Sequence, residues 1–355
     1  MSRYWSSLLE GLTPYVAGEQ PRDRKYIKLN TNENPYPPSP HVIEKIKELA
    51  SSDLRLYPDP EALELRESIA SYYGIQKENV FVGNGSDEVL ALAFMAFFLK
   101  DSPLLFPDIT YSFYPVYCDL FGITYETVPL TKDFEIDTSL YSSDKAGIIF
   151  PNPNAPTGRA LPLENIEKLL NHNPDTPIAI DEAYVDFGAE SAVKLIGSHD
   201  NLLVIQTFSK SRSLAGLRTG FAVGSGELIE GLNMVKNSFN SYPLDRLAIG
   251  GAAQAVKDED YFIKCRDMII ETREQTSSRL KNFGFTVIPS KANFIMTSHP
   301  EVRGKELYEK LKEQGILVRH FDKPGINEFI RVTIGTEEEM NIFMDRVGDI
   351  IKTLK

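Results

Sequence analysis

The sequence predicts an α/β protein, with a large domain whose mostly parallel central sheet lies between helices and a smaller α+β domain. Helical periodicity alternates with short apolar runs from residue 63 to about residue 225. These runs end in Gly, Pro, Asp or Ser, which is typical of strands buried on both faces of a sheet. Long helical patterns follow residue 226, and short strands and helices return after Gly284. The 355 residues also exceed the roughly 250 to 300 that one hydrophobic core usually supports.

The elements follow in chain order. In the large domain we expect helices over 62–74, 86–100 and 226–240, and strands within 79–85, 102–107, 147–150, 178–180, 202–205 and 221–223. A helix over 247–284 is expected to cross between the domains. The small domain should contain apolar runs at 285–290, 293–298, 316–321 and 329–335, a helix over 304–315 and a closing helix from Glu337. We therefore expect a large domain over 30–245 and a small domain built from 1–29 and 246–355, which includes the interdomain helix.

Composition and charge argue against several classes of protein. Lysine and arginine total 38 against 50 acidic residues, and the net charge of −12 repels polyanions, so nucleic acid is not an expected partner. The chain has no signal-peptide core and no apolar run of the roughly 18 residues that would suggest a membrane span. Cys118 and Cys265 lie far apart in apolar surroundings, which indicates buried free thiols and a cytoplasmic protein. No metal is expected, because metal-ligand spacing is absent from the five histidines, His41, His172, His199, His299 and His320.

Residues 206–221, between two expected strands, combine small, polar and cationic side chains. A lysine that forms a Schiff base needs a position fixed by its neighbours and a lowered pKa. A loop at the carboxyl end of a strand can supply both to Lys210. Arg218, close to two glycines, could offer two parallel donors to a phosphate. Taken alone, the same residues could also form a solvated basic loop.

Residues 178–184 form an apolar strand that ends in an acid. Pyridoxal phosphate requires a carboxylate against its pyridinium nitrogen, because the protonated ring is the electron sink of its chemistry. Asp181 is placed to be that carboxylate, and Tyr184 could contact the phenolate oxygen of the same ring. The alternative is that Asp181 only caps the turn that follows.

Residues 80–89 read as a strand, a glycine turn and the start of a helix, which together make an anion site. Glu88 stands where a dinucleotide fingerprint would carry its third glycine, which argues against a nicotinamide or flavin cofactor. A phosphate monoester fits the segment better. In a nearby aromatic loop, Tyr111 could stack on a pyridine ring, although a core tyrosine would explain it equally well in isolation.

Taken in order, these segments resemble the fold type I aminotransferases, and within them the histidinol-phosphate aminotransferase family, over essentially the whole chain. The signatures that carry the resemblance lie at 29–40 (LNTNENPYPPSP), at 209–218 (Ser-Lys followed by Gly-Leu-Arg) and at 331–335 (RVTIG). The resemblance implies pyridoxal 5'-phosphate as the cofactor. The residues implied to hold it are Lys210, bound covalently, Asp181 at the ring nitrogen, Tyr184 at the ring oxygen, Tyr111 stacked on the ring, and Gly85, Ser86, Asp87, Ser209 and Arg218 at the phosphate.

The same resemblance implies residues for the substrates and for a second subunit. Tyr57 looks like the residue that family members contribute across a homodimer interface to the neighbouring site. Arg331 resembles the arginine that binds the α-carboxylate of glutamate and 2-oxoglutarate, and Arg319 resembles one that binds the substrate's phosphate. Asn34, from the opening signature, is also expected to bind the substrate.

The chain departs from the family pattern in two places. Relatives usually carry Asn directly before their Pro-Thr-Gly turn, where this chain has Ala155, so one donor to the ring oxygen is lost. Asn154, one position earlier, or a water could replace this donor, although a one-residue offset in an extended segment usually points the side chain elsewhere. Residues 241–245 (SYPLD) also depart from the commoner form, which affects the nearby substrate pocket.

The resemblance implies transamination between L-histidinol phosphate and 2-oxoglutarate, a step of histidine biosynthesis. An aminotransferase for aromatic amino acids would look nearly the same, because both accept the carboxylate of glutamate and a flat ring. A phospho-amino-acid decarboxylase and a non-catalytic, cofactor-sensing regulator are further alternatives. The regulator would need a DNA-binding module, for which the segment before Leu29 is too short and the chain too acidic.

Overall fold

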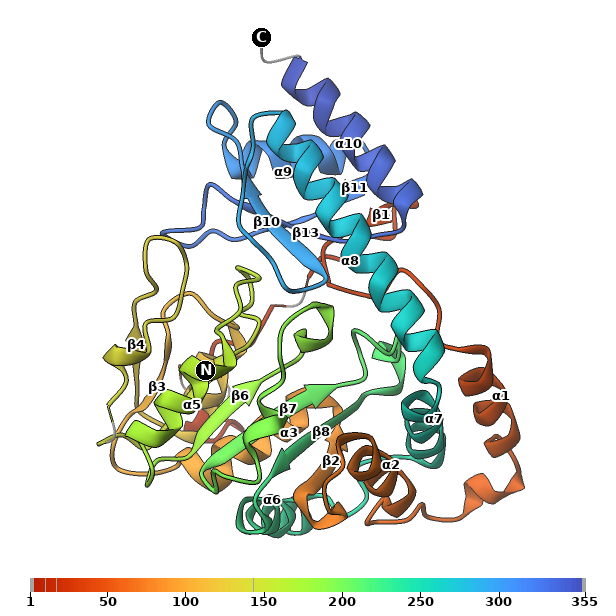
Figure 1. Ribbon diagram of the computed structural model, residues 1–355, viewed down its shortest axis with the longest axis vertical. Coiled ribbons are helices and arrows are strands. Elements are labelled where there is room, and N and C mark those ends of the chain that lie inside the picture. Colours follow the sequence, from red (N-terminus) through yellow and green to blue (C-terminus); the bar gives the residue numbers. More distant parts are fainter. Residues whose placement is uncertain (1–2, 10, 17, 143, 353–355) are drawn as a thin grey trace.

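Two sheets organise the chain in the computed structural model, which describes residues 3–9, 11–16, 18–142 and 144–352. A seven-stranded sheet occupies the lower part of the molecule in Figure 1, and a four-stranded sheet lies above it. Helices pack around both. The α/β class expected from the alternating pattern is confirmed.

The large sheet has the strand order β2-β8-β7-β6-β5-β3-β4. Its strands are β2 (Val80–Asn84), β3 (Leu104–Pro107), β4 (Tyr125–Val128), β5 (Gly147–Pro151), β6 (Ile178–Asp181), β7 (Leu202–Thr207) and β8 (Thr219–Gly224). Neighbouring strands are parallel from β7 to β4, whereas β8 runs antiparallel to both β2 and β7. The sheet is mostly parallel, as expected, and the carboxyl ends of β5, β6 and β7 meet at one edge.

Helices cover both faces of this sheet. Successive side chains of each strand point to opposite faces and therefore pack in two different cores. Ile148 and Ile178 belong to one core, shared with α2, α5 and α7, and Ile149 and Ala179 belong to a second core, shared with α3, α4 and α6. Helix α7 contacts both α1 and α2. The bounds are α1 (Pro40–Leu49), α2 (Leu63–Tyr73), α3 (Gly85–Ala93), α4 (Phe113–Phe121), α5 (Leu163–His172), α6 (Gly226–Phe239) and α7 (Arg246–Lys257).

The upper part is α+β. Its antiparallel sheet has the order β12-β13-β10-β9, and a separate core joins it to three helices. The elements are α8 (Glu259–Asn282), β9 (Thr286–Val287), β10 (Phe294–Ser298), α9 (Gly304–Glu313), β12 (Arg319–His320), β13 (Ile330–Thr333) and α10 (Glu337–Lys352). In addition, β1 (Ile27–Lys28) pairs in parallel with β11 (Ile316–Leu317). This pairing ties the start of the chain to the upper part, and we propose the division into 30–245 and 1–29 with 246–355 on that basis.

The expectation of one uninterrupted helix over 247–284 is wrong. Asp258 has non-helical backbone angles (φ −94°, ψ 62°) and separates α7 from α8. Its carboxylate accepts a hydrogen bond from Ser39 Oγ and lies 3.1 Å from His41 Nδ1 at the start of α1. The interruption between α7 and α8 is therefore stabilised by contacts with a segment that is distant in the sequence. Beyond it, α8 runs from the lower part into the upper part, as expected (Figure 1).

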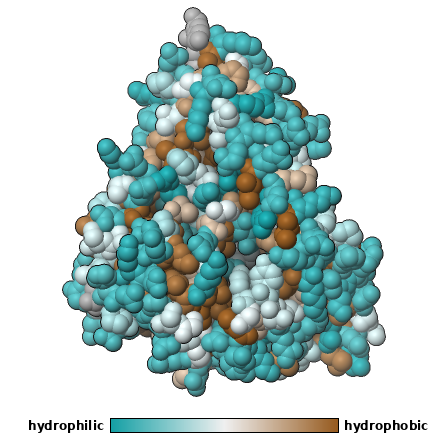
Figure 2. All heavy atoms as spheres, in the orientation of Figure 1, coloured by the Kyte–Doolittle hydropathy of each residue, from teal (hydrophilic) through white to brown (hydrophobic). Residues whose placement is uncertain are grey.

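Hydrophilic atoms dominate the face of the molecule seen in Figure 2, and hydrophobic atoms form small groups among them. Cys118 and Cys265 are free and buried, as expected. Across the part of the chain that the structure describes, no helix combines the length and the apolar character needed to cross a membrane.

Candidate active site

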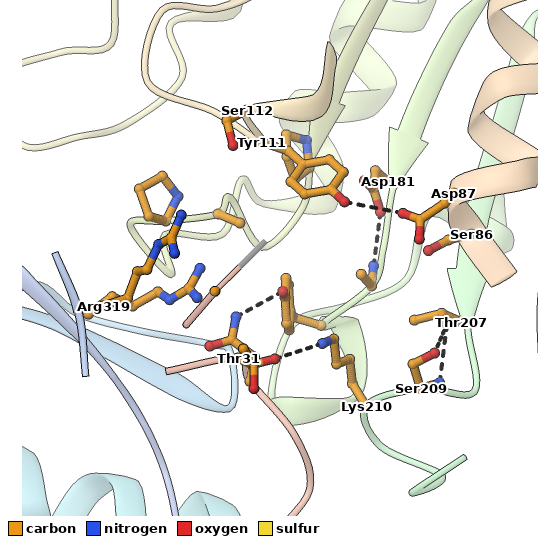
Figure 3. A pocket seen from close by; sticks show the side chains of 18 of the residues that line it. Thr31, Ser86, Asp87, Tyr111, Ser112, Asp181, Thr207, Ser209, Lys210 and Arg319 are labelled. Atoms are coloured by element: carbon orange, nitrogen blue, oxygen red, sulfur yellow. Dashed lines mark hydrogen bonds between the residues drawn. The ribbon is translucent and has the colours of Figure 1, made fainter. Parts of the chain in front are cut away.

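A cavity of about 370 Å³ opens at the edge where the carboxyl ends of the parallel strands meet. Ten of the expected site residues line it, namely Ser86, Asp87, Tyr111, Asp181, Tyr184, Ser209, Lys210, Arg218, Arg319 and Arg331. Figure 3 shows Ser86 and Asp87 at one end, Arg319 at the other and Lys210 between them. Segments from both the large and the small sheet therefore build one site.

Lys210 lies in the loop that follows β7. Its Nζ donates a hydrogen bond to the backbone oxygen of Thr31 at 3.2 Å, and Asn34 Nδ2 donates to the backbone oxygen of Lys210 itself at 2.9 Å. Burial, with a smaller contribution from the nearby Arg331, lowers the pKa of Lys210 to about 8. A substantial fraction of the amine is then neutral near pH 8, which a Schiff-base nucleophile requires.

Asp181 is the last residue of β6 and is only 4% exposed. Tyr114 donates its hydroxyl proton to Oδ2 at 3.0 Å, and the amide of Ala183 lies 3.3 Å from Oδ1. Burial raises the pKa of Asp181 to about 6 despite these bonds. Neither of these two partners is a cation. A positively charged ring nitrogen beside Asp181 would therefore stabilise the ionised form of the carboxylate.

Two glycines let the start of α3 approach Arg218 closely. Gly85 has φ +78°, and a Cβ there would lie 2.7 Å from Arg218 Nη2. A Cβ on Gly220 would lie 2.4 Å from the backbone nitrogen of Ser86. The helix start, with its free N–H groups and positive dipole end, and the guanidinium therefore form one cradle that suits a phosphate. Asp87 Oδ2 lies 2.9 Å from Arg218 Nη2 and neutralises part of its charge.

The opposite end of the cavity concentrates positive charge. Arg319 and Arg331 are directly paired residues of the neighbouring strands β12 and β13, and both line the cavity. Arg331 Nη2 donates to the backbone oxygen of Asn30 at 3.0 Å, whereas its buried Nε has no hydrogen-bond partner. Burial, together with Arg319, lowers the pKa of Arg331. Like charges opposite each other destabilise a sheet, and an anion bound between them would relieve that cost.

Four expected residues lie outside the cavity lining. Asn154 donates to the backbone oxygen of Ile109 at 3.0 Å and to Thr157 Oγ1 at 3.1 Å, while its neighbour Ala155 lines the cavity. Tyr57 is 79% exposed and stacks on Tyr242, with ring centroids 4.7 Å apart. The remaining two are Asn34, which supports the backbone of the lysine loop, and Gly85, which shapes the cradle. The roles expected of all four stay predictions.

Several site residues were not expected from the sequence. Tyr114 bonds to Asp181, Asn32 Nδ2 donates to the Tyr184 hydroxyl at 2.9 Å, and Tyr15 enters the cavity with its ring 4.8 Å from that of Phe113. The spacing of three residues between Tyr111 and Tyr114 at the start of α4 could have indicated Tyr114. For Asn32 and Tyr15 no local pattern exists, because their contacts join segments far apart in the chain.

The site fits pyridoxal phosphate. A mostly buried amine, a buried carboxylate without a cationic partner and a glycine-lined anion cradle surround one cavity, and Tyr111 lies along it with its hydroxyl 3.1 Å from Asp87 Oδ1. These are the groups that would hold the aldehyde carbon, the ring nitrogen and the phosphate of that cofactor. The arginine pair lines the same cavity, and Figure 3 shows Arg319 at the end opposite Ser86 and Asp87.

Comparison with known proteins agrees with this geometry. A family model described as "Aminotransferase class I and II" matches residues 24–347. Histidinol-phosphate aminotransferase 1 of Hydrogenovibrio crunogenus is 56% identical over 353 residues, which cover 99% of each chain. Histidinol-phosphate aminotransferase of Aromatoleum aromaticum is 55% identical over 356 residues, which cover 99% of this chain and 100% of the relative.

A solved structure shows the same fold. It is that of histidinol-phosphate aminotransferase from Sinorhizobium meliloti in complex with pyridoxal-5'-phosphate, which has a TM-score of 0.91 and 22% identity and covers 100% of this chain and 99% of its own. At that identity the likeness concerns the fold alone, and the closer sequence relatives establish the family. The chain belongs to the class I and II aminotransferases, and within them to the histidinol-phosphate aminotransferase family.

Proposed function

We propose that this chain is a pyridoxal-phosphate-dependent aminotransferase that moves the amino group between L-histidinol phosphate and 2-oxoglutarate, in histidine biosynthesis. The observation that carries the proposal is the single cavity that joins Lys210 and Asp181 to the paired arginines Arg319 and Arg331. The relatives above, which are named for this reaction and match the whole chain, support it.

The cofactor, when bound, supplies an electron sink for the carbon that loses its proton. The residues that would hold it are Lys210 through Nζ, Asp181 at the ring nitrogen, Tyr184 at the ring oxygen, Tyr111 along the ring, and Ser86, Asp87, Ser209 and Arg218 at the phosphate. Each side chain comes from a strand end, from the loop beside it or, for Ser86 and Asp87, from the start of α3. The sheet therefore sets their mutual positions before any ligand binds.

Lys210 is the residue best placed to move a proton. Because its pKa is lowered to about 8, Nζ can both accept and release a proton near neutral pH, as a general base and acid must. The backbone oxygen of Thr31 holds the amine at the cavity wall. The buried Asp181 and the partly buried Tyr184 line the same cavity.

The arginine pair would select the substrate by charge. Histidinol phosphate carries a phosphate and no carboxylate, whereas glutamate carries two carboxylates, so one pocket must hold different anions in the two half-reactions. Arg331, with an unpaired buried Nε, suits the carboxylate of glutamate, and Arg319 across the strand suits the phosphate. An aromatic amino acid would bring only one anionic group.

A substrate panel tests the function. The purified protein is assayed with 2-oxoglutarate and, separately, histidinol phosphate, phenylalanine or tyrosine as amino donor. We expect the largest kcat/KM with histidinol phosphate. A larger value with phenylalanine would favour the aromatic aminotransferase, and release of carbon dioxide from a phospho-amino acid would favour the decarboxylase.

We propose further that the protein is a homodimer in which each subunit lends Tyr57 to its partner's site. In a single chain Tyr57 is exposed and outside the cavity. It stacks on Tyr242. Leu56, which precedes Tyr57 in the chain, is 47% exposed, and Phe239, three residues before Tyr242, is 76% exposed. Such a group of exposed apolar side chains is typical of a protein interface. The family resemblance assigns the same role to Tyr57.

Subunit mixing tests the shared site. Tyr57→Ala and Lys210→Ala, each inactive in the proposed dimer, are dissociated, mixed and reassociated. If Tyr57 acts across the interface, hybrid dimers regain one complete site and the mixture recovers up to a quarter of the wild-type activity, as random pairing of the two chains requires. A mixture that stays inactive, although native mass spectrometry confirms hybrid dimers, would contradict the sharing.

We also propose a cytoplasmic location. Its support is that both cysteines, Cys118 and Cys265, are free and buried, which suits a reducing compartment. Fractionation of the cells that produce the protein, with detection by antibody, tests this directly.

A further inference from the structure

We infer that Asn32 is a positioning residue, which acts through Tyr184 to aim the tyrosine hydroxyl proton at the ring oxygen of the cofactor. The inference rests on the proposed function, since it needs bound pyridoxal phosphate. Asn32 is 1% exposed and lines the cavity, and its Nδ2 donates to the Tyr184 hydroxyl oxygen at 2.9 Å. The sequence patterns around Asn32 assign it no role of its own.

The direction of this hydrogen bond follows from the bonds on the other side of Asn32. Its backbone N–H donates to Thr333 Oγ1 at 2.9 Å, and the hydroxyl of Thr333 donates to Asn32 Oδ1 at 3.1 Å. If the amide were turned around, Thr333 would accept twice, and its buried hydroxyl proton would lose this partner. The amide therefore presents Oδ1 to Thr333 and Nδ2 to Tyr184.

The consequence falls on the hydroxyl of Tyr184. A tyrosine hydroxyl has one proton to donate and can accept through its oxygen. Because Asn32 donates to that oxygen, the proton of Tyr184 must point away from Asn32. Both residues line the cavity, so the remaining direction open to the proton is toward the ligand.

The neighbouring positions make this direction important. Ala155, which packs in the same apolar cluster as Tyr184, has no side-chain donor, and the amide of Asn154 donates to Ile109 and Thr157 instead. Of the three candidates, Tyr184 alone faces the cavity with a side-chain donor. The direction of the Tyr184 hydroxyl proton therefore affects the ring oxygen of the cofactor more than it would if a second side chain also donated to that oxygen.

The backbone holds Asn32 in place from two sides. Its φ of +54° lies in the left-handed region, which asparagine adopts more readily than most residues. Asn293 Nδ2 donates to its backbone oxygen at 3.0 Å, and the preceding residue, Thr31, accepts from Lys210 Nζ. The segment thus contacts both the amine that holds the cofactor and the tyrosine that faces its ring oxygen.

Charged and titratable groups also face Tyr184 from other elements. Burial raises the pKa of Tyr184; Arg331 and the bond from Asn32 lower it, whereas Asp181 and Tyr15 raise it. Lys210 Nζ lies 6.0 Å from its ring centroid. These groups stay in place when Asn32 is replaced, so a comparison between variants isolates the amide.

The test is a pH titration of the visible absorption of the cofactor-loaded protein without substrate. A hydrogen bond donated to the ring oxygen favours its charged form and so lowers the pH midpoint of the spectral change. Asn32→Gly, which suits a positive φ, should raise the midpoint by about 0.4 to 1 pH unit, the range that one hydrogen bond supports. Tyr184→Phe should raise it by at least as much.

The double variant distinguishes an effect of Asn32 that acts through the Tyr184 hydroxyl from a purely structural role of Asn32. In the Tyr184→Phe background, Asn32→Gly should shift the midpoint by less than about 0.2 unit, because the tyrosine hydroxyl through which it acts is gone. An equal shift in both backgrounds, or no shift in the wild-type background, would overturn the inference. Asn293→Ala is the matched control, since it removes a bond to the backbone of Asn32 and leaves the bond to Tyr184; its midpoint should stay at the wild-type value.

If Asn32→Gly does not fold or does not bind the cofactor, a second variant provides the test. Thr333→Val preserves the side-chain shape and releases the amide of Asn32. It should raise the midpoint by a smaller amount that again disappears in the Tyr184→Phe background, and an unchanged midpoint would overturn the inference. If the unmutated protein showed no visible cofactor band at all, the proposed function would fail first, and this inference with it.

Discussion

The two ends of the cavity are built differently. At the cofactor end, Lys210 Nζ bonds to a backbone oxygen, the Asp181 carboxylate accepts from Tyr114, and Arg218 pairs with Asp87. At the substrate end, Arg319 and Arg331 face each other across adjacent strands, and the buried Nε of Arg331 has no hydrogen-bond partner. The charged groups at the cofactor end have partners within the protein, whereas at the substrate end two like charges lie side by side and one buried N–H of Arg331 has no acceptor.

This difference matches two kinds of ligand. A cofactor that stays bound benefits from groups that are already held in position, because little ordering remains to be done when it binds. A substrate anion that enters and leaves is attracted by the positive charge that Arg319 and Arg331 concentrate at one end of the cavity. The contrast would explain how a chain with a net charge of −12 could bind the phosphorylated and dicarboxylate substrates of the proposed reaction.

Replacement of the amine should break the cofactor end completely. Lys210→Ala should abolish transamination and remove the visible absorption of the covalently bound cofactor, because no other lysine is among the described residues that line the cavity. Borohydride reduction followed by mass spectrometry identifies the modified peptide. Lys194→Ala, at an exposed lysine paired with Glu190, is the control and should behave as wild type. Cofactor attached to a peptide that lacks Lys210 would overturn the assignment.

Loss of the carboxylate charge should have the next largest effect. Asp181→Asn should fold and bind the cofactor but lose at least about tenfold in kcat, since an amide cannot hold the ring nitrogen protonated and ~1.4 kcal/mol already changes a rate tenfold. Tyr114→Phe, which removes only the hydrogen bond to Asp181, should cost less. A kcat for Asp181→Asn within about a factor of two of wild type would mean that the residue is only a cap.

The lowered pKa of Lys210 predicts a pH-dependent stability of the cofactor-free protein. The pKa falls from 10.5 in the unfolded chain to about 8 in the folded one. Between these values the unfolded chain binds more protons, so the wild type gains stability as the pH rises through this window. Lys210→Met should therefore be more stable than wild type by on the order of 3 kcal/mol below pH 8, and the difference should vanish toward pH 10.5. Denaturant unfolding at several pH values measures it, and a difference that is independent of pH would contradict the burial of this amine.

Local patterns predicted most of the large sheet. Six of its seven strands coincide with apolar runs, because strands buried on both faces read as continuous hydrophobic segments. The strand β4 was not expected, since three of its four residues are exposed at the edge of the sheet. The break at Asp258 was missed for a different reason: it depends on Ser39 and His41, more than 200 residues away in the chain.

The candidate site divides in the same way. Lys210 and Asp181 could be found because each lies at the end of a strand with a recognisable pattern around it. Asn32 and Tyr15 could not, because their importance comes from contacts with Tyr184 and Phe113 that only the folded chain creates. The offset of Asn154 from the cavity agrees with the direction expected for a one-residue shift in an extended segment.

The difference between the two ends is tested most directly with Arg319→Ala. The two half-reactions of this variant, one with histidinol phosphate and one with glutamate, are measured separately through the absorption of the cofactor. A charge-assisted arginine contact contributes roughly 1.5 to 3 kcal/mol, so the variant should bind histidinol phosphate about ten- to a hundredfold more weakly and glutamate less so. Arg331→Ala should reverse this preference, and Arg279→Ala, whose guanidinium bonds to Asn341 away from the cavity, should change neither. Equal weakening of both substrates by Arg319→Ala would contradict the account.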